Sequence, residues 1–243
     1  MYGSDGPRPF REGLLEGKVA LVTGGDSGIG RGIAAVLSRL GAEVILTGSR
    51  IGGLDTWFRE LTSEGGPVSG FDSDPQSADS LGELVEELET VHGHLDLLVT
   101  VARHDEGNGS FDTVVEGVAS YCRAVQPLLS RASGAIVNLV DACCDDTRAA
   151  RVAPIEELTR RLAGRWVRQG VRVSAVALGA IDTSAFERCP WEADGVDKPD
   201  VPVGRLGTPW EVGAVVAFLA SEAAQFITGT TLHVDGGQSL DAS

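Results

Sequence analysis

Short runs of aliphatic and β-branched residues alternate with longer amphipathic stretches over most of this chain. The strand-like runs occupy residues 18–23, 43–47, 67–71, 95–101, 135–140, 171–177 and 231–235. Apolar residues recur at helical spacing over residues 29–40, 54–64, 77–91, 111–131, 154–169 and 209–221. Strands and helices that alternate in this way predict right-handed βαβ crossovers and a parallel sheet with helices on both faces. We therefore expect an α/β fold, a doubly wound three-layer sandwich of about seven parallel strands.

The length and composition favour one large domain. The chain has 243 residues, of which 42% are hydrophobic, and it contains no internal repeat. Residues 1–16 are polar and rich in Gly, Pro and Arg, so we expect a flexible extension followed by a single domain over residues 17–243. No apolar run is typical of a signal peptide, and none reaches the roughly 18 residues that span a bilayer. We expect a cytoplasmic protein with no membrane segment.

The net charge of the chain indicates which kinds of partner it can bind. The formal net charge is -15, which disfavours nucleic acid and anionic membranes because binding to them depends on Lys and Arg. Small molecules or other proteins are better partners. The four cysteines show no C-x-x-C spacing, so we expect free thiols and no metal site.

A glycine-rich segment follows the first strand and opens the first helix. It reads Thr23-Gly-Gly-Asp-Ser-Gly-Ile-Gly30. Small residues let the backbone approach a pyrophosphate, and the helix N-terminus presents free N–H groups and a positive dipole end to it. In a doubly wound sheet, ligands collect at this carboxyl edge of the strands. The segment predicts a dinucleotide site, and the alternative is a tight turn that binds nothing. The candidate cofactor-binding residues here are Gly24, Ser27, Gly28, Ile29 and Gly30.

Further motifs extend the pattern along the chain. They occur at Leu95 to Val99, Gly134 to Asn138, Gly170 to Val176, Gly204 to Pro209, Phe226 to Gly229 and Val234 to Gly237. Together with the glycine-rich segment, they make residues 10–240 resemble the short-chain dehydrogenase/reductase family, close to its acyl-carrier-protein reductases and dienoyl-CoA reductases. The resemblance implies a Rossmann-like sandwich, a nicotinamide cofactor and oligomers, either homodimers or homotetramers. Residues 184–203 correspond to the family's variable substrate lid.

The resemblance also assigns cofactor contacts. Asp72 and Ser73 would face the adenine, Ala102 ends the fourth strand beside it, and Ile181 and Thr183 would hold the nicotinamide carboxamide. Members that prefer NAD place an acidic residue at the end of the second strand, where this chain has Gly48, followed by Ser49 and Arg50. We therefore expect NADP(H) to be favoured over NAD(H). The alternative is that Arg50 is an ordinary solvated side chain, and that the protein binds no cofactor.

The family's catalytic pair is missing from the sequence. The only tyrosines are Tyr2 and Tyr121 and the only lysines are Lys18 and Lys198, so no Tyr-x-x-x-Lys can be formed. Alignment to the family's motifs places other residues at the Asn, Ser, Tyr and Lys positions: Val114, Asp141, Arg148 and Val152. Counting forward along the loop instead places Pro154 and Leu158 at the last two positions.

Three residues could replace the lost acid. His104 follows the fourth strand and titrates in the useful range, which makes it the best single candidate. Asp141 could donate a proton only if burial raised its pKa. Arg148 stays protonated, but it could clamp a carboxylate or stabilise an oxyanion. The alternative is that these are ordinary surface charges on a shortened loop.

Three functions fit these residues. The first is an atypical NADP(H)-dependent reductase or dehydrogenase acting on a small carbonyl or hydroxyl metabolite without the Ser-Tyr-Lys set. The second is a non-redox acid–base enzyme, such as a cyclase, dehydratase or isomerase, in the same pocket. The third is a non-catalytic subunit that forms a hetero-oligomer with an active paralogue.

Overall fold

Seven parallel strands form one sheet at the centre of the structure, in the order β3-β2-β1-β4-β5-β6-β7. The computed structural model describes residues 10–25, 27–48, 55–102, 110–141, 148–183 and 201–240. This architecture confirms the doubly wound α/β sandwich. The strands are β1 (Val19–Thr23), β2 (Glu43–Gly48), β3 (Val68–Asp72), β4 (Leu97–Ala102), β5 (Ala135–Asp141), β6 (Arg172–Leu178) and β7 (Thr231–Val234).

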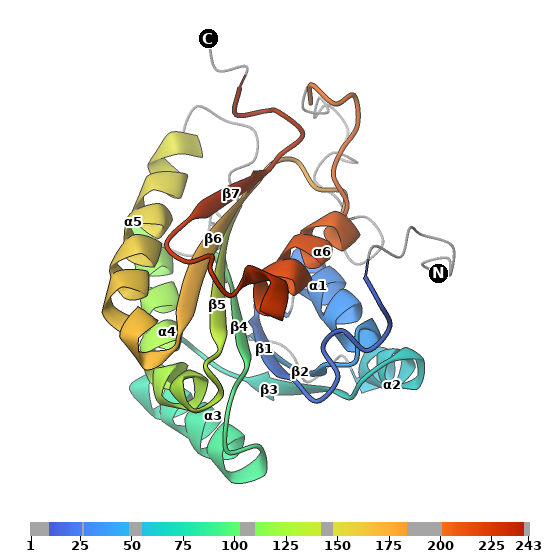
Figure 1. Cartoon of the computed structure of the whole chain (residues 1–243), viewed down its shortest axis with the longest axis vertical. Coiled ribbons are helices and arrows are strands. Elements are labelled where there is room, and N and C mark those ends of the chain that lie inside the picture. Colours follow the sequence, from blue (N-terminus) through green and yellow to red (C-terminus); the bar gives the residue numbers. More distant parts are fainter. Residues whose placement is uncertain are drawn as a thin grey trace.

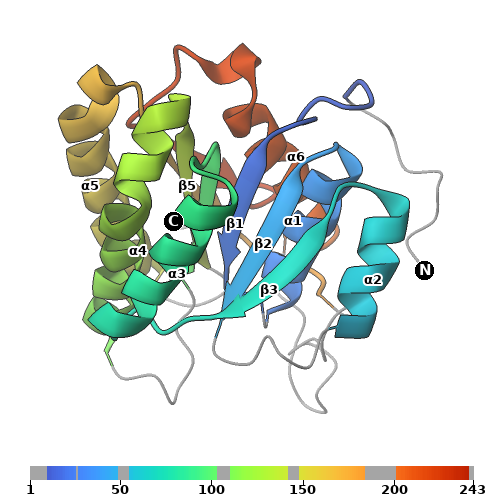
Figure 2. The same ribbon diagram turned by 90° about the horizontal axis from the view of Figure 1, so that it is seen from below.

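Helices cover both faces of this sheet (Figures 1 and 2). One face carries α1 (Gly28–Arg39), α2 (Asp55–Glu64) and α6 (Pro209–Ala220). The other carries α3 (Ala78–Val91), α4 (Phe111–Ala132) and α5 (Arg148–Trp166). Two short 3₁₀ turns follow α5 and α6, namely η2 (Val167–Gln169) and η4 (Glu222–Ala224).

Successive side chains along each strand point to opposite faces of the sheet, so the hydrophobic core has two parts, one on each face. On β1, Ala20 and Val22 pack with α1 and α6, whereas Val19 and Leu21 pack with α3 and α4. Strands buried on both faces are almost wholly apolar, which explains why the strand runs were so distinct in the sequence. The strand order reverses between β1 and β4, so their carboxyl ends open the crevice where ligands bind in such sheets.

One helix begins earlier than the sequence predicted. Helical spacing suggested a start at Pro154, but α5 begins at Arg148, so Arg148 and Arg151 belong to the helix and not to a loop. Proline was a misleading boundary because it lacks an N–H donor and usually occupies the first turn. Here the two alanines at 149 and 150 extend the helix ahead of it. The other elements begin and end within about two residues of the expected positions.

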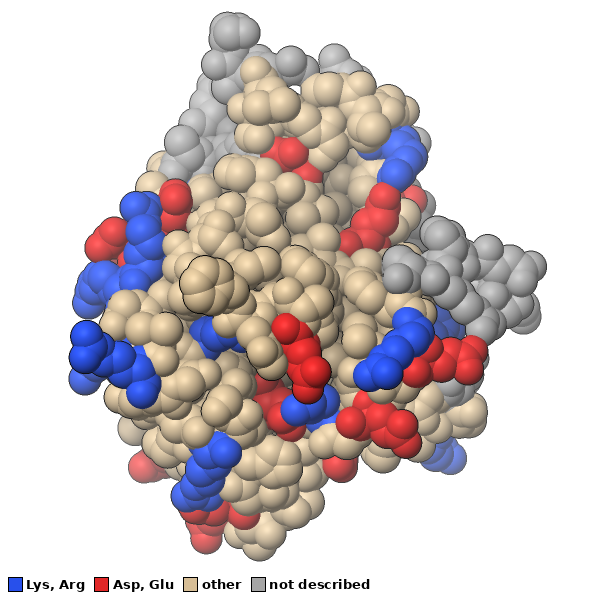
Figure 3. All heavy atoms as spheres, viewed as in Figure 1, with Lys and Arg blue, Asp and Glu red and all other residues tan. Residues whose placement is uncertain are grey.

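Charged side chains of both signs are interspersed on the face seen in Figure 3, without one large patch of either. Several form surface pairs, such as Arg131 with Glu89 at 2.7 Å. Each exposed pair of this kind contributes little stability. Within the described ranges, no helix combines the length and the apolar character needed to cross a membrane.

The N-terminus of α6 is fixed by a capping box. Thr208 accepts a hydrogen bond from the Glu211 backbone N–H at 3.3 Å, and the Glu211 carboxylate accepts one from the Thr208 N–H at 2.9 Å. Arg205 donates to the same carboxylate at 2.7 and 2.9 Å. The hydrogen bond from Arg205 lowers the pKa of Glu211. The ionised carboxylate therefore serves the cap and the ion pair together.

We expect Glu211→Ala to lower the free energy of unfolding by about 1 kcal/mol at neutral pH, measured by urea denaturation. Because the folded-state pKa of Glu211 is depressed, its contribution is complete above the ordinary glutamate pKa and disappears as the pH falls through the lowered value. The difference between wild type and variant should therefore shrink in acid. Glu157→Ala, at an exposed position of α5, is the matched control. Equal effects of the two substitutions would contradict the capping role.

Candidate functional site

The hydroxyl of Ser27 holds together the glycine-rich loop between β1 and α1. Ser27 is the N-cap of α1, and its hydroxyl accepts a hydrogen bond from the Gly30 N–H at 3.0 Å. The same hydroxyl donates to the Gly24 carbonyl at 2.7 Å. Gly24 has a φ of 66°, in the left-handed region that favours glycine. These contacts fold the loop back on itself at the end of β1.

Close packing explains why glycine occupies the helix start. A Cβ at Gly30 would lie 2.2 Å from the Gly24 carbonyl oxygen, so the first turn of α1 can sit on the loop only without a side chain there. On the other side, a Cβ at Gly24 would lie 3.1 Å from the Cβ of Val101 on β4. The Val101 N–H donates to the Thr23 hydroxyl at 3.0 Å. The loop therefore rests directly on the end of β4.

The N-terminus of α1 is suited to an anion. Gly28, Ile29 and Gly30 form its first turn, and that turn holds no acidic residue. By contrast, α3, α4 and α6 each carry an acidic residue in the first turn: Asp79, Asp112 and Glu211. Acidic side chains at that position offset the positive end of the helix dipole. α5 also lacks an acidic residue in its first turn, but only α1 opens directly from the glycine-rich loop. A bare helix start of this kind suits an anionic ligand. Asp26, just before the cap, lies outside the described residues.

Two further predicted residues lie at the carboxyl end of β3, next to the end of β2. Asp72 pairs in register with Gly48, and the Ser73 N–H donates to the Gly48 carbonyl at 3.2 Å. The Ser73 hydroxyl is buried and makes no hydrogen bond in the described structure. Buried hydroxyls are nearly always paired, so an orphan at a ligand-binding edge suits a polar group from a ligand. The Tyr121 hydroxyl donates to the Ser73 carbonyl at 3.3 Å and thereby ties this turn to α4.

The remaining cofactor candidates lie at the end of β4 and after β6. Ala102 is the buried last residue of β4. Ile181 forms a parallel bridge with Gly207, and the Asp182 N–H donates to the Gly207 carbonyl at 2.8 Å. Thr183 is buried, with 4% of its surface exposed. The backbone of this segment is thus held by the stretch that leads into α6. Arg50 lies outside the described residues.

The candidate catalytic residues are placed only by their backbone. Asp141 is the last residue of β5 and pairs in register with Leu178, and Arg148 is the first residue of α5. Both therefore lie at the carboxyl edge, but their side chains are outside the described part of the structure, as is the whole of His104. Val152 and Leu158, from the two alternative alignments, are both buried in the core on the side of α3 to α5. Aliphatic side chains at these places cannot carry a proton.

A buried polar network lies beneath this edge, and the sequence did not reveal it. Asn138 on β5 accepts a hydrogen bond from the Thr100 hydroxyl at 2.8 Å and donates to the Thr159 hydroxyl at 2.9 Å. Cys122 on α4 contacts the same amide oxygen at 3.6 Å. Burial raises the pKa of the Cys122 thiol to about 12, so it remains protonated. The sequence signal for this network is a polar residue, Thr100 or Asn138, within an otherwise apolar strand. That signal does not identify the hydrogen-bond partners, because they are distant in the sequence.

The described residues hold no group of three or more His, Cys, Asp or Glu side chains that could bind a metal ion. Cys122, the cysteine among them, is a free thiol, as the spacing predicted for all four.

The chain is similar to reductases and dehydrogenases over most of its length. A family model described as enoyl-(acyl carrier protein) reductase matches residues 24–239. A 3-oxoacyl-(acyl-carrier-protein) reductase of Thermotoga maritima is 30% identical, over 92% of this chain and 98% of its own. A cis-4-hydroxycyclohexanecarboxylate dehydrogenase of Sinomonas cyclohexanicum is 34% identical, over 90% and 96%. The solved structure of a gluconate 5-dehydrogenase from Burkholderia cenocepacia, in complex with NADP and tartrate, has a TM-score of 0.79 and 25% identity, over 94% and 97%.

We expect Gly30→Ala to destabilise the protein by about 1 to 3 kcal/mol, because the added Cβ overlaps the Gly24 carbonyl. Gly82→Ala in α3 is the control, since a Cβ there meets nothing within 4 Å. That substitution should stabilise by roughly 0.5 to 1 kcal/mol through helix propensity. Chemical denaturation of both variants tests the pair, and a neutral or stabilising effect of Gly30→Ala would show that the loop is not packed in this way.

Proposed function

The chain belongs to the short-chain dehydrogenase/reductase family, and we propose that it is an atypical NADP(H)-dependent member that acts on a small carbonyl or hydroxyl metabolite. The observation that carries the proposal is the loop of β1 and α1. Its left-handed Gly24, its bare Gly30 and its first turn without acidic residues together suit a pyrophosphate. The orphaned Ser73 hydroxyl suits the adenosine end of the same ligand.

The chain's own residues would hold the cofactor along the carboxyl edge of the sheet. The first-turn N–H groups of α1 would bind the pyrophosphate, and Asp72 and Ser73 would meet the adenine. Thr183, buried after β6, would hold the carboxamide. Gly48 stands where members preferring NAD have an acidic residue, and Arg50, two residues further on, would favour the 2′-phosphate of NADP(H). When bound, the nicotinamide supplies the hydride chemistry.

Proton handling is the part of the site that departs from the family. A positioned general acid contributes about 10²- to 10⁴-fold, or roughly 3 to 5 kcal/mol of the barrier. Arg148 and Val152 both lie in the first turns of α5, which runs without interruption to Trp166, and this supports the alignment that puts them at the Tyr and Lys positions. Val152 cannot relay a proton. We assign proton donation to His104, with Asp141 at the end of β5 as the second candidate acid, and oxyanion or carboxylate binding to Arg148.

Oligomerisation is part of the proposal. Phe226 and Leu240, near the end of the chain, are almost wholly exposed, at 105% and 83% of their reference surfaces. A subunit contact over these two side chains would remove their apolar surface from water, which is favourable. We propose a homodimer or homotetramer that covers them, which light scattering coupled to size-exclusion chromatography would test.

Titration of the purified protein with NADPH and NADH, followed by nicotinamide fluorescence, tests cofactor binding. We expect a Kd below about 1 mM for NADPH and weaker binding of NADH, because Arg50 favours the 2′-phosphate. Arg50→Ala should remove the difference between the two nucleotides. Failure of both to bind below about 1 mM would overturn the proposal.

A panel of small ketones and 3-oxoacyl thioesters, with NADPH oxidation as readout, tests the chemistry. His104→Ala should lower kcat by about 10²-fold or more and remove the pH dependence near neutrality. His94→Ala is the control, because His94 lies at the opposite edge of the sheet, beside Asp96. Turnover that needs Asp141 but no nucleotide would instead identify a non-redox acid–base enzyme. Activity that appears only with a copurifying paralogue would identify a non-catalytic subunit.

A further inference from the structure

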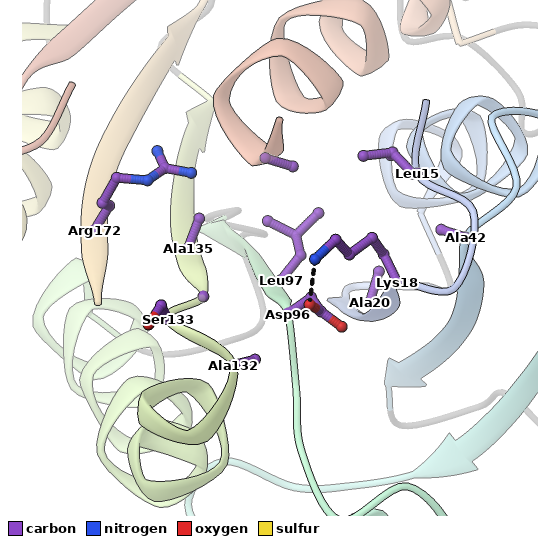
Figure 4. A pocket seen from close by; sticks show the side chains of 12 residues that line it. Leu15, Lys18, Ala20, Ala42, Asp96, Leu97, Ala132, Ser133, Ala135 and Arg172 are labelled. Carbon is purple, nitrogen blue, oxygen red and sulfur yellow. Dashed lines mark hydrogen bonds and ion pairs between the residues drawn. The ribbon is translucent and has the colours of Figure 1, made fainter. Parts of the chain in front are cut away.

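A separate pocket lies at the amino edge of the sheet, away from the glycine-rich loop (Figure 4). Its walls come from the beginnings of β1, β4, β5 and β6 and from the last residue of α6, Ala220. Its volume is about 40 Å³, a few times the roughly 10–15 Å³ that one buried water needs. The pocket therefore has room for a small ion or chemical group.

Arg172, the first residue of β6, forms one wall of this pocket. Its side chain is partly buried, and it makes no hydrogen bond or ion pair with any described residue. In Figure 4 the guanidinium extends past Ala135 toward the centre of the pocket. Burial lowers the pKa of Arg172. A guanidinium that has lost water without gaining a partner is unfavourable, and an oxyanion would compensate for that loss.

Lys18 presents a second cation from the opposite wall. Its ammonium forms an ion pair with Asp96 Oδ1 at 2.9 Å, and two of its N–H groups remain for other acceptors. The second oxygen of Asp96 accepts the Val19 N–H at 3.0 Å and lies 3.2 Å from His94 Nε2. The carboxylate is thus held at the sheet edge, and the two cations outnumber it. Three further acidic residues lie near the lining residues in the sequence: Glu16 next to Leu15, Glu43 next to Ala42, and Glu222 two residues beyond Ala220. Glu16 and Glu222 are exposed, and the Glu43 carboxylate lies 3.7 Å from His92 Nδ1.

We propose that this pocket binds a tetrahedral oxyanion, either inorganic phosphate or the phosphate of a monoester. Donors face the pocket from two opposite walls, as Figure 4 shows for Arg172 and Lys18. The oxygens of a tetrahedral anion can meet both, whereas the two oxygens of a carboxylate project to one side. The proposal does not depend on the dinucleotide site, because the two sites lie at opposite edges of the sheet.

Titration calorimetry at constant ionic strength, with inorganic phosphate as the probe, tests the pocket. Arg172→Gln should raise the Kd for phosphate at least about tenfold. Arg168→Gln, which removes the same charge from an exposed position of η2, should leave it unchanged. Lys18→Gln should weaken binding by a smaller factor and provides a second test if Arg172→Gln fails to fold. Glycerol phosphate serves as the monoester, and its tighter binding would assign the pocket to a phosphorylated metabolite.

Amide chemical shifts separate this pocket from the dinucleotide site, which also suits phosphate. Phosphate in the pocket should shift the amides of Val19, Gly134 and Arg172 in a sample saturated with NADPH or lacking it. Shifts confined to Gly25, Ser27 and Gly30 would overturn the pocket while supporting the dinucleotide loop. Equal affinity of wild type and Arg172→Gln, or acetate binding as tightly as phosphate, would also overturn it.

Discussion

Parallel pairing of all seven strands is the constraint on which the rest of the molecule depends. Because every strand runs the same way, every carboxyl end falls on one edge, and the loops that follow the strands must meet there. The glycine-rich loop, the Asp72–Ser73 turn and the Ile181–Thr183 segment lie far apart in sequence, and this pairing alone brings them to one edge. The same rule sends Lys18, Asp96 and Arg172 to the opposite edge. Strand direction therefore determines on which edge the glycine-rich loop and the pocket each lie.

The two halves of the carboxyl edge follow different requirements. The glycine-rich loop is constrained through its backbone. Gly24 adopts a left-handed conformation, and the packing at Gly30 leaves no room for a Cβ. Such requirements leave little choice of residue. Proton transfer depends on a side chain with a suitable pKa, and several residue types at different positions can provide one. A chain can therefore keep the first half while the second changes, and this division agrees with a loop that is intact and a Tyr-x-x-x-Lys pair that is absent.

The sequence predicted most of the fold because its signals are local. Strand runs buried on two faces and helices with one apolar stripe are visible in short windows, as for β1 and α1. Pro154 misplaced the start of α5 because proline's preference for a first turn is statistical, and favourable neighbours overrode it. The contact of Tyr121 with Ser73 and the network around Asn138 could not be predicted, since each joins residues from different elements. The roles of Asp141 and Arg148 depend on side-chain environments that no sequence pattern encodes.

The network around Asn138 also bears on how this scaffold changes over evolutionary time. A single amide links β4 through Thr100 and α5 through Thr159, and it contacts Cys122 on α4, so four elements share one buried anchor. The segments that leave β4 and β5 begin from strands whose spacing this anchor maintains. Insertions, deletions and exchanged charges in those segments can accumulate without disturbing the strands beneath them. A substitution that removed the Asn138 amide would therefore act on four elements at once, whereas a substitution in the segments that follow β4 or β5 would leave the hydrogen bonds of this network in place.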